Sequence, residues 1–262
     1  MHITKKQWTV AGIGFFVVVL TAFGYFNFAK APAPAISNTA TSTVPSTTNA
    51  STTEQASVTS GPFPINKKDT IASWNFKGAY TGNDTFIAKA NADIVLLKGL
   101  LGKGQYDDYD LYIGMGNDYV LLGDGKSAYQ NYNRAINIHP KKGLAYANVG
   151  HLMIQLGAYA TAADAYATAT AVEPWVLEYH IERLTYLTRQ FPTDNTRIAT
   201  AFADAEKQFG DTAPILAIKA EWLTGLKRYA DAITTWERAK LLSPGKDTSA
   251  IDTEIARLKT KL

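Results

Sequence analysis

Residues 143–176 read GLAYANVGHLMIQLGAYATAADAYATATAVEPWV, and they repeat a pattern that is already present in the 34 residues before them. Residues 109–142 read YDLYIGMGNDYVLLGDGKSAYQNYNRAINIHPKK. A shift of 34 positions superposes Gly116 on Gly150, Leu122 on Leu156, Gly123 on Gly157, Ala128 on Ala162, Tyr132 on Tyr166, Ala135 on Ala169 and Pro140 on Pro174. Because self-similarity at a fixed period of this length marks repeat architectures, we expect a stack of similar units.

The matched residues suit two helices joined by a turn. Small residues such as Gly116 and Gly150 let two helices approach closely, and the bulky Tyr132 and Tyr166 can then pack between neighbouring pairs. Proline cannot continue a helix and disfavours helical geometry in the residue before it, so Pro140 marks the end of its unit. The period therefore predicts one helix pair for every 34 residues.

This pattern resembles the tetratricopeptide repeat family, whose unit is a helix, a turn and a second helix. The resemblance is clearest in the run Leu156–Tyr159 and in the later Ala162, Tyr166, Ala169 and Pro174. It implies an all-α fold, namely a right-handed superhelical array of about four tetratricopeptide helix pairs. The expected units are 109–142, 143–176, 177–212 and 213–246.

The last two units depart from the pattern to different degrees. The fourth unit keeps the expected residue types at Ala220, Ala232, Trp236, Ala239 and Pro244. The third unit has Leu184 where a small residue belongs, and Gly210 replaces the closing proline. Its identity as a helix pair rests on Phe202 and Ala205, so it is the unit that has drifted furthest.

Capping helices are expected on both sides of the repeats, over residues 84–101 and 248–262, where apolar side chains recur at helical spacing. Residues 63–83 are predicted to form an extended arm, because Trp74 and Phe76 alternate with polar residues. The arm either packs against the helices or occupies their groove in cis, and the sequence leaves both possibilities open.

Residues 1–30 are predicted to anchor the chain in a membrane. The segment Trp8–Phe28 carries no charge, and about 20 apolar residues in a helix span the hydrocarbon core. Two lysines precede it, so we expect a single pass through a cytoplasmic membrane, with the N-terminus inside and the repeats outside in a bacterial-type envelope. Small residues at positions 29 and 31 leave a cleaved signal peptide and a secreted protein as the alternative. Residues 31–62, rich in Ala, Pro, Ser and Thr, are expected to be a disordered linker.

The composition argues for binding rather than chemistry. Three of the 26 basic residues flank the apolar segment, which leaves 23 basic and 23 acidic residues from position 31 onward. A neutral domain without a basic stripe is a poor match for nucleic acid. The chain has no cysteine, and its four histidines lack the close spacing of metal ligands. We therefore expect no catalytic residue, no metal and no cofactor.

In the tetratricopeptide family a protein or peptide binds the concave face lined by the first helix of each pair. The resemblance places Asn117, Asn148, His151, Ile154, Glu178, Ile181 and Glu182 on that face in this chain. Because Glu178 and Glu182 stand where cations would hold an acidic tail, a basic or neutral segment is the better match. Alternatively, these polar residues are only solvated and the partner binds elsewhere.

These observations together predict a membrane-anchored scaffold for protein–protein interaction, which binds an unidentified protein or peptide through the groove of its repeats. The competing hypothesis is a self-associating structural protein of the cell envelope, in which the repeats bind one another as a homo-oligomer. Both hypotheses assign the chain to binding, and neither requires a reaction.

Overall fold

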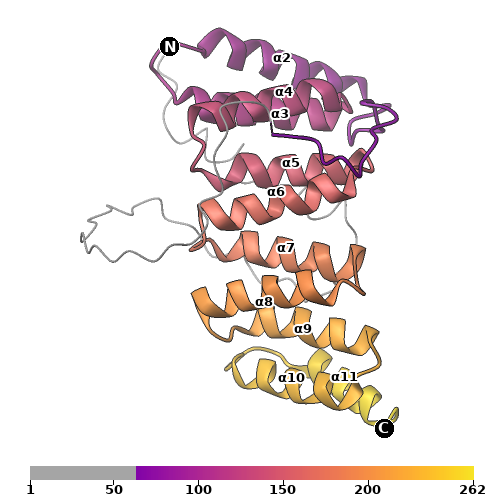
Figure 1. The fold of residues 1–262 in the computed structure, drawn as a ribbon. Helices are drawn as coiled ribbons and strands as arrows, with labels where there is room; N and C mark the ends of the chain where they lie inside the picture. The colour runs from indigo at the N-terminus through magenta and orange to yellow at the C-terminus, as the bar shows by residue number, and fades with distance from the viewer. Residues whose placement is uncertain (1–62) are drawn as a thin grey trace, which may run out of the picture. The chain divides into compact units, whose positions relative to one another are not determined.

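The computed structural model of this chain describes residues 63–262. The predicted anchor over residues 1–30 and the predicted linker over residues 31–62 lie outside the described residues. Among the helices of residues 63–262, none combines the length and the apolar character that a membrane crossing requires. Figure 1 shows this part of the chain as an arm followed by a stack of helices.

Ten α-helices and no β-strand are found between residues 63 and 262. In chain order they are α2 (Asp84–Leu100), α3 (Asp108–Leu122), α4 (Gly125–Ile138), α5 (Gly143–Gln155), α6 (Tyr159–Val172), α7 (Leu177–Gln190), α8 (Asn195–Phe209), α9 (Ala213–Gly225), α10 (Tyr229–Leu241) and α11 (Ser249–Lys259). The all-α fold predicted from the repeat is therefore confirmed for the described residues.

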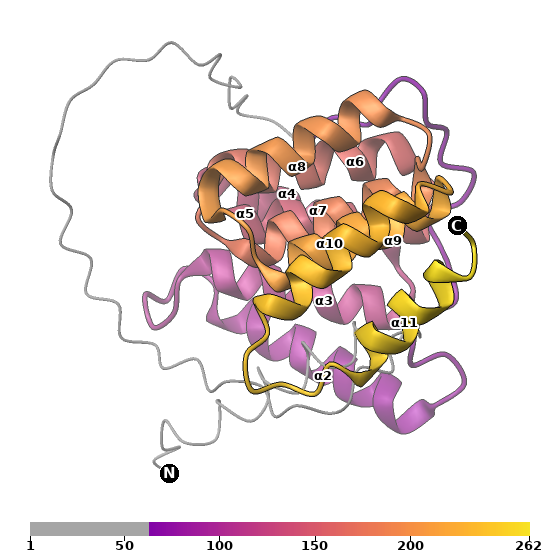
Figure 2. The same cartoon turned by 90° about the horizontal axis from the view of Figure 1, so that it is seen from below.

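Four helix hairpins make up the centre of the stack. Helix α3 packs with α4, α5 with α6, α7 with α8, and α9 with α10. Helix α2 packs against α3 at one end of the stack, and α11 packs against α10 at the other. Figure 2, which looks along the stack, shows α6 and α8 on one side of α7 and α9. We call α3, α5, α7 and α9 the first helices, and α4, α6, α8 and α10 the second helices.

The turn inside the first pair shows why the sequence folds into hairpins. Gly123 ends α3 with a φ of 84°, which is left-handed geometry that glycine adopts without steric cost. Asp124 then begins α4, because its carboxylate accepts hydrogen bonds from the Ser127 backbone N (3.0 Å) and hydroxyl (2.7 Å). Helix α4 ends at Ile138, two residues before Pro140, where the sequence predicts the unit to close.

The packing of tyrosine on glycine within the first two pairs confirms the packing that the repeat predicts. A Cβ atom on Gly116 would lie 2.4 Å from the Tyr132 ring, and one on Gly150 would lie 3.0 Å from the Tyr166 ring. Both rings are buried. Because the second helix can bring a tyrosine this close only to a bare backbone, glycine and tyrosine recur in the two units as a matched set.

The third pair differs from the others in the way the sequence predicts. Leu184 fills the position of the small residue and is fully buried. Phe202 of α8 packs against Trp222 of α9 with ring centroids 5.9 Å apart, and α9 also packs directly against α7. One apolar core extends from Phe63 to Ile215, and a second core, from residue 216 to residue 258, belongs to α9, α10 and α11. The last pair and α11 thus have a core of their own.

The arm, residues 63–83, runs along the turns and the second helices of the first two pairs. The Trp74 carbonyl accepts a hydrogen bond from the Gly125 backbone N (2.8 Å), and the Phe76 backbone N donates to the Gly123 carbonyl (3.1 Å). The Trp74 ring also packs against Tyr129 of α4, with centroids 5.2 Å apart. The extended conformation predicted for this segment is stabilised by a turn, not by a neighbouring strand.

The arm also supplies a helix cap that α6 lacks. The residue before α6, Ala158, has no side chain that can cap the helix. Asp69 accepts hydrogen bonds from the backbone N atoms of Ala160 (3.1 Å) and Thr161 (2.6 Å) and from the Thr161 hydroxyl (2.6 Å). Burial alone would raise the pKa of Asp69, but these donors lower it below its usual value. The carboxylate is therefore ionised at the positive end of the α6 dipole.

Candidate protein-interaction face

The structure places all seven predicted binding residues on first helices. Asn117 lies on α3, Asn148, His151 and Ile154 lie on α5, and Glu178, Ile181 and Glu182 lie on α7. Glu178 is exposed and the other six are half-buried, so each keeps part of its surface accessible. We call these seven residues the first-helix face. None of the hydrogen bonds made by the arm between residues 63 and 83 reaches them.

The two asparagines of this face are hydrogen-bonded to each other. Asn148 Nδ2 donates a hydrogen bond to Asn117 Oδ1 over 3.3 Å. The Tyr132 hydroxyl donates to the same oxygen over 2.8 Å, which fixes the orientation of the Asn117 amide. The Asn148 carbonyl oxygen, one N–H of Asn148 and the Asn117 NH₂ group retain hydrogen-bonding capacity, because an amide side chain has two donors and an acceptor with two lone pairs.

One unit further along, His151 and Glu182 form the equivalent pair. His151 Nε2 lies 3.7 Å from Glu182 Oε2, and the two side chains are 33% and 26% exposed. The Tyr166 ring, which corresponds to Tyr132, meets the His151 ring edge-on with centroids 5.5 Å apart. The same three positions of successive units thus lie together, but the two amides and the tyrosine are hydrogen-bonded in the first set, whereas the imidazole and carboxylate of the second set are in contact without a hydrogen bond.

The electrostatics of this second pair differ from those of an ion pair. Burial lowers the pKa of His151 to about 4, so the imidazole is neutral at pH 7. Burial, together with the negative charge of Glu178, raises the pKa of Glu182 to about 7. Among the described residues, Glu182 Oε2 is buried and accepts no hydrogen bond. The face therefore carries acidic groups that no cation of residues 63–262 neutralises by direct contact.

The apolar members of the face are less closely integrated. Ile154 packs at the margin of the main core, whereas Ile181 is half-buried on α7 between the two glutamates in sequence. The structure thus brings together Asn117 with Asn148 and His151 with Glu182, and it does not join all seven residues into one cluster. A ligand that touched them all would have to extend across α3, α5 and α7.

Sequence reasoning missed Glu221 of α9. This residue stands 70 positions after His151, the same offset that relates Gly150 to Ala220, so the repeat contained the signal. Burial raises the pKa of Glu221, the charge of Arg189 opposes the rise, and that of Glu254 adds to it. The acidic character of the first helices consequently continues into the fourth pair.

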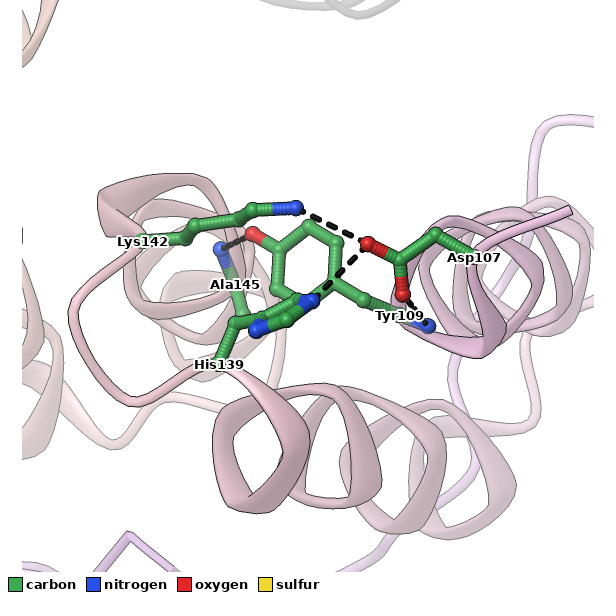
Figure 3. A network of polar contacts seen from close by, with 5 residues as sticks. All are labelled: Asp107, Tyr109, His139, Lys142 and Ala145. Carbon is green, nitrogen blue, oxygen red and sulfur yellow. Dashed lines mark hydrogen bonds and ion pairs between the residues drawn. The ribbon is translucent and has the colours of Figure 1, made fainter.

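A polar network at the junction of the first two units fixes their relative position (Figure 3). Asp107 caps α3 and also contacts His139 Nε2 (2.8 Å) and Lys142 Nζ (3.1 Å), both of which follow α4. The Tyr109 hydroxyl accepts a hydrogen bond from the Ala145 backbone N of α5 (3.2 Å). These contacts link α3 to the start of α5, which sets the register in which Asn117 meets Asn148.

The structure offers no close grouping of metal ligands: within residues 63–262, no three or more His, Asp or Glu side chains converge in a way that could hold an ion. His139 contacts one carboxylate, that of Asp107, and His180 Nε2 lies 3.0 Å from the Pro174 carbonyl oxygen. These two histidines have structural contacts at the junctions between units.

Comparison with known proteins returned structures but no sequence relatives. No protein-family model and no curated protein sequence matches this chain. A thermophilic TPR protein of Thermus thermophilus is 16% identical, with a TM-score of 0.46 over 66% of this chain and 92% of its own. MamA of AMB-1 is 16% identical, with a TM-score of 0.45 over 64% of this chain and 92% of its own. The TPR2AB domain of yeast Sti1, in a complex with pHSP90, is 17% identical, with a TM-score of 0.38 over 66% of this chain and 79% of its own.

The class of protein follows from the chain itself. A 34-residue sequence period, four stacked hairpins and the recurrent packing of tyrosine on glycine describe a tetratricopeptide-like helical repeat. Proteins of this architecture present long faces built from successive equivalent helices, and the first-helix face is such a surface.

Proposed function

We propose that this chain is a scaffold for protein–protein interaction, which binds an extended protein segment across its first-helix face. The observation that carries the proposal is the pair of equivalent contacts, Asn117 with Asn148 and His151 with Glu182, on successive first helices. Each pair leaves polar groups accessible at the same position of its unit. A segment lying across the stack would meet such groups at regular intervals, as peptide recognition by repeat proteins requires.

The chemistry of the face favours a basic or neutral partner. Glu178 and Glu182 lie one helical turn apart on α7, and the nearest described partner of Glu182 is a neutral imidazole. A lysine or arginine side chain would neutralise charge that this part of the chain leaves unbalanced, whereas an acidic tail would add to the repulsion. Action by binding, without catalysis or a cofactor, is part of the proposal.

The proposal includes attachment to a membrane. The uncharged segment Trp8–Phe28 has the length of a single span, and the residues between it and the arm have the composition of a flexible tether. With two lysines before the segment, the repeats would lie outside a cytoplasmic membrane. Mass spectrometry of the mature protein tests this part, because an N-terminus near position 32 would replace the anchor with a cleaved signal peptide.

A pull-down from native membranes with the full-length chain tests the binding face. The double variant Asn148→Lys and Glu182→Lys adds positive charge at two positions of the first-helix face, on α5 and α7. We expect at least a tenfold loss of the captured partner, with the same helical content by circular dichroism. The matched control is Gln130→Lys with Glu237→Lys, at exposed sites on α4 and α10 with the same total charge change. Unaltered capture by the double variant, or equal loss in the control, contradicts the proposal.

A further inference from the structure

Helix α2 is apolar on two sides, of which the stack buries one. Ala90 and Ile94 are buried on the side that faces α3, and Leu97 lies 3.0 Å from the position of a Cβ on Gly114. On the other side, Val95 is 71% exposed and Leu96 is 52% exposed. Exposure of two neighbouring large apolar side chains at the end of a repeat stack needs a physical reason.

The exposed side forms a continuous strip along α2. Helical spacing places five residues on it, all uncharged and all exposed: Ala88, Ala92, Val95, Leu96 and Gly99. We call them the outer face of α2. Nothing lies within 4 Å of the position that a Cβ on Gly99 would take, so the space above the helix backbone is open there. The face thus combines two projecting side chains with three small residues that leave room for a partner.

The opposite end of the stack has a different surface. Asp252, Thr253 and Arg257 are exposed on α11, and Asp252 is paired with Lys240 of α10 over 2.5 Å. Terminal units of repeat proteins need a polar outer surface to remain soluble, and α11 meets this requirement. Helix α2 does not, so within residues 63–262 the stack has a polar surface at one end and an apolar surface at the other.

We propose that two copies of this chain associate through the outer faces of their α2 helices, about a two-fold axis. In this arrangement the axis passes by Val95 and Leu96, so these side chains of the two copies pack against one another, and Ala92 of each copy lies opposite Gly99 of the other, where small residues let the helices approach, as an isologous contact requires. Head-to-tail stacking would instead set this apolar face against the charged surface of α11. An antiparallel arrangement of the two helices also separates their like dipole ends.

A second copy fits the face better than a lipid surface does. A helix that lies on a bilayer gains affinity from bulky apolar residues and from cations, and small residues at the centre of its apolar face contribute little. Small residues are what close packing of two helices requires. The combination of Ala88, Ala92 and Gly99 with two projecting side chains therefore points to a helix as the occupant.

The size of the contact sets its strength. A helix of 17 residues is about 25 Å long, and packing it against its copy buries on the order of 400 Å² per chain, about half of a standard stable interface. The dimer is accordingly weak and depends on concentration. It does not use the first-helix face, so both copies remain able to bind a partner.

The absence of cysteine from the sequence allows a direct test in the full-length chain. Val95→Cys introduces a single thiol at the centre of the outer face of α2, where the two-fold axis passes, and Ala256→Cys introduces one at an exposed alanine of α11. After mild oxidation in native membranes, we expect a disulfide-linked dimer for the α2 variant at a yield at least five times that of the α11 variant. Equal yields, or a thiol at position 95 linked mainly to a different protein, would overturn the proposal.

A second substitution separates specific packing from chance collision. Leu96→Asp, added to Val95→Cys, sets two like charges against each other across the two-fold axis while leaving the side of α2 that faces α3 unchanged. We expect the yield of the linked dimer to fall at least fivefold, with partner capture through the first-helix face unaltered. An undiminished yield would show that α2 does not pack on α2, and protection of the thiol by lipid without any dimer would assign the face to the bilayer instead.

Discussion

Gly116 shows how much of the repeat depends on single atoms. The Tyr132 ring occupies the space that a side chain at this position would need, since a Cβ would come within 2.4 Å of it. Alanine is about 1 kcal/mol better than glycine in a helix, and overpacking a core costs roughly 1–3 kcal/mol. We expect Gly116→Ala to lower the free energy of unfolding by up to about 2 kcal/mol, as measured by urea denaturation.

Gly→Ala substitutions at two other positions should have smaller effects, because a Cβ atom there would meet less obstruction. Gly150 would bring a Cβ to 3.0 Å from the Tyr166 ring, and Gly225 would bring one into open space. Gly150→Ala should therefore be less harmful than Gly116→Ala, and Gly225→Ala should be neutral or stabilising by up to about 1 kcal/mol. The steric explanation fails if all three variants change the unfolding free energy equally.

Asp118 makes stability depend on pH. Burial raises the pKa of this α3 side chain to about 7, with the charge of Asp93 adding to the shift and that of Lys89 opposing it. A carboxyl pKa raised by folding gives stability that is complete below the usual value of 3.8 and is lost as the pH rises towards 7. Asp118→Asn stays neutral, so we expect it to be more stable than the parent at pH 8 and nearly equal to it at pH 4.

Urea midpoints at the two pH values measure this effect, which amounts to at most about 1.4 kcal/mol for each pH unit between the two pKa values. Glu237→Gln, at an exposed site on α10, removes one carboxylate without relieving burial and serves as the control. A gain for Asp118→Asn at pH 4 as large as that at pH 8 would assign the effect to packing instead of ionisation.

At the residue scale, the sequence predicted which side chains pack inside the repeats, but it did not predict which residues of the first-helix face contact one another. The 34-residue shift identified Tyr132 and Tyr166 as packing residues, and the structure confirms this. It did not predict that His151 would meet Glu182, because that contact depends on the relative register of α5 and α7, which side-chain packing between units determines. Whether the face binds a partner stays a prediction.

At the element scale, the arm contributes to the stability of a helix that it does not adjoin in sequence. Asp69 supplies the side-chain hydrogen bonds at the start of α6, and loss of a helix cap costs typically about 1 kcal/mol. We expect Asp69→Ala to lower the unfolding free energy by about that amount at pH 7. Thr70→Ala, at the exposed neighbouring residue, should have little effect.

The cap also has a pH dependence with a definite sign. The pKa of Asp69 is lowered by folding, so its contribution is present above the usual carboxyl range and is lost as the pH falls below it. The difference between the parent and Asp69→Ala should therefore shrink at low pH in urea denaturation. A difference that stays constant down to pH 2 would mean that the carboxylate charge plays no part.

The helices and their pairing were the part of the fold that the sequence predicted best. Periodicity and the closing prolines placed the helix pairs, and Phe202 with Ala205 were sufficient to identify the drifted pair, α7 with α8. The target of the arm could not be predicted, since alternation of apolar and polar residues shows that a segment is extended but does not identify what it contacts. The described arm packs mainly along the turns and second helices, with Phe63 also against Tyr146 of α5, and its hydrogen bonds do not reach the seven residues of the first-helix face.

At the scale of the whole molecule, the division of the core predicts two levels of stability. Leu258 of α11 is fully buried in the second core, which α9, α10 and α11 share. Leu258→Ala leaves a cavity in this core and lowers its stability by roughly 2–5 kcal/mol. We expect faster amide hydrogen exchange in α10 and α11 and unchanged exchange in α5 and α6, because units of a repeat protein interact mainly with their neighbours.

Equal acceleration of exchange in all the helices would show that the described stack unfolds as one cooperative unit. Leu152→Ala provides the matched comparison, since Leu152 of α5 is equally buried in the main core. The sequence did not predict this division. The fourth unit keeps the repeat pattern, and the break between the cores depends on how α9 is seated against α7 and α8.

The cap that Asp69 provides to α6 also determines when the arm can fold during synthesis of the chain. Asp69 precedes Thr161 by 92 residues, so a ribosome adding about 5–20 residues per second completes the partner roughly 5–18 s after the arm has been made. Until then the binding site of Asp69 does not exist, because the first two units must fold before the arm can pack along them. During synthesis the arm is made before the helices that it contacts, and in that interval it is accessible to chaperones, proteases or a neighbouring nascent chain.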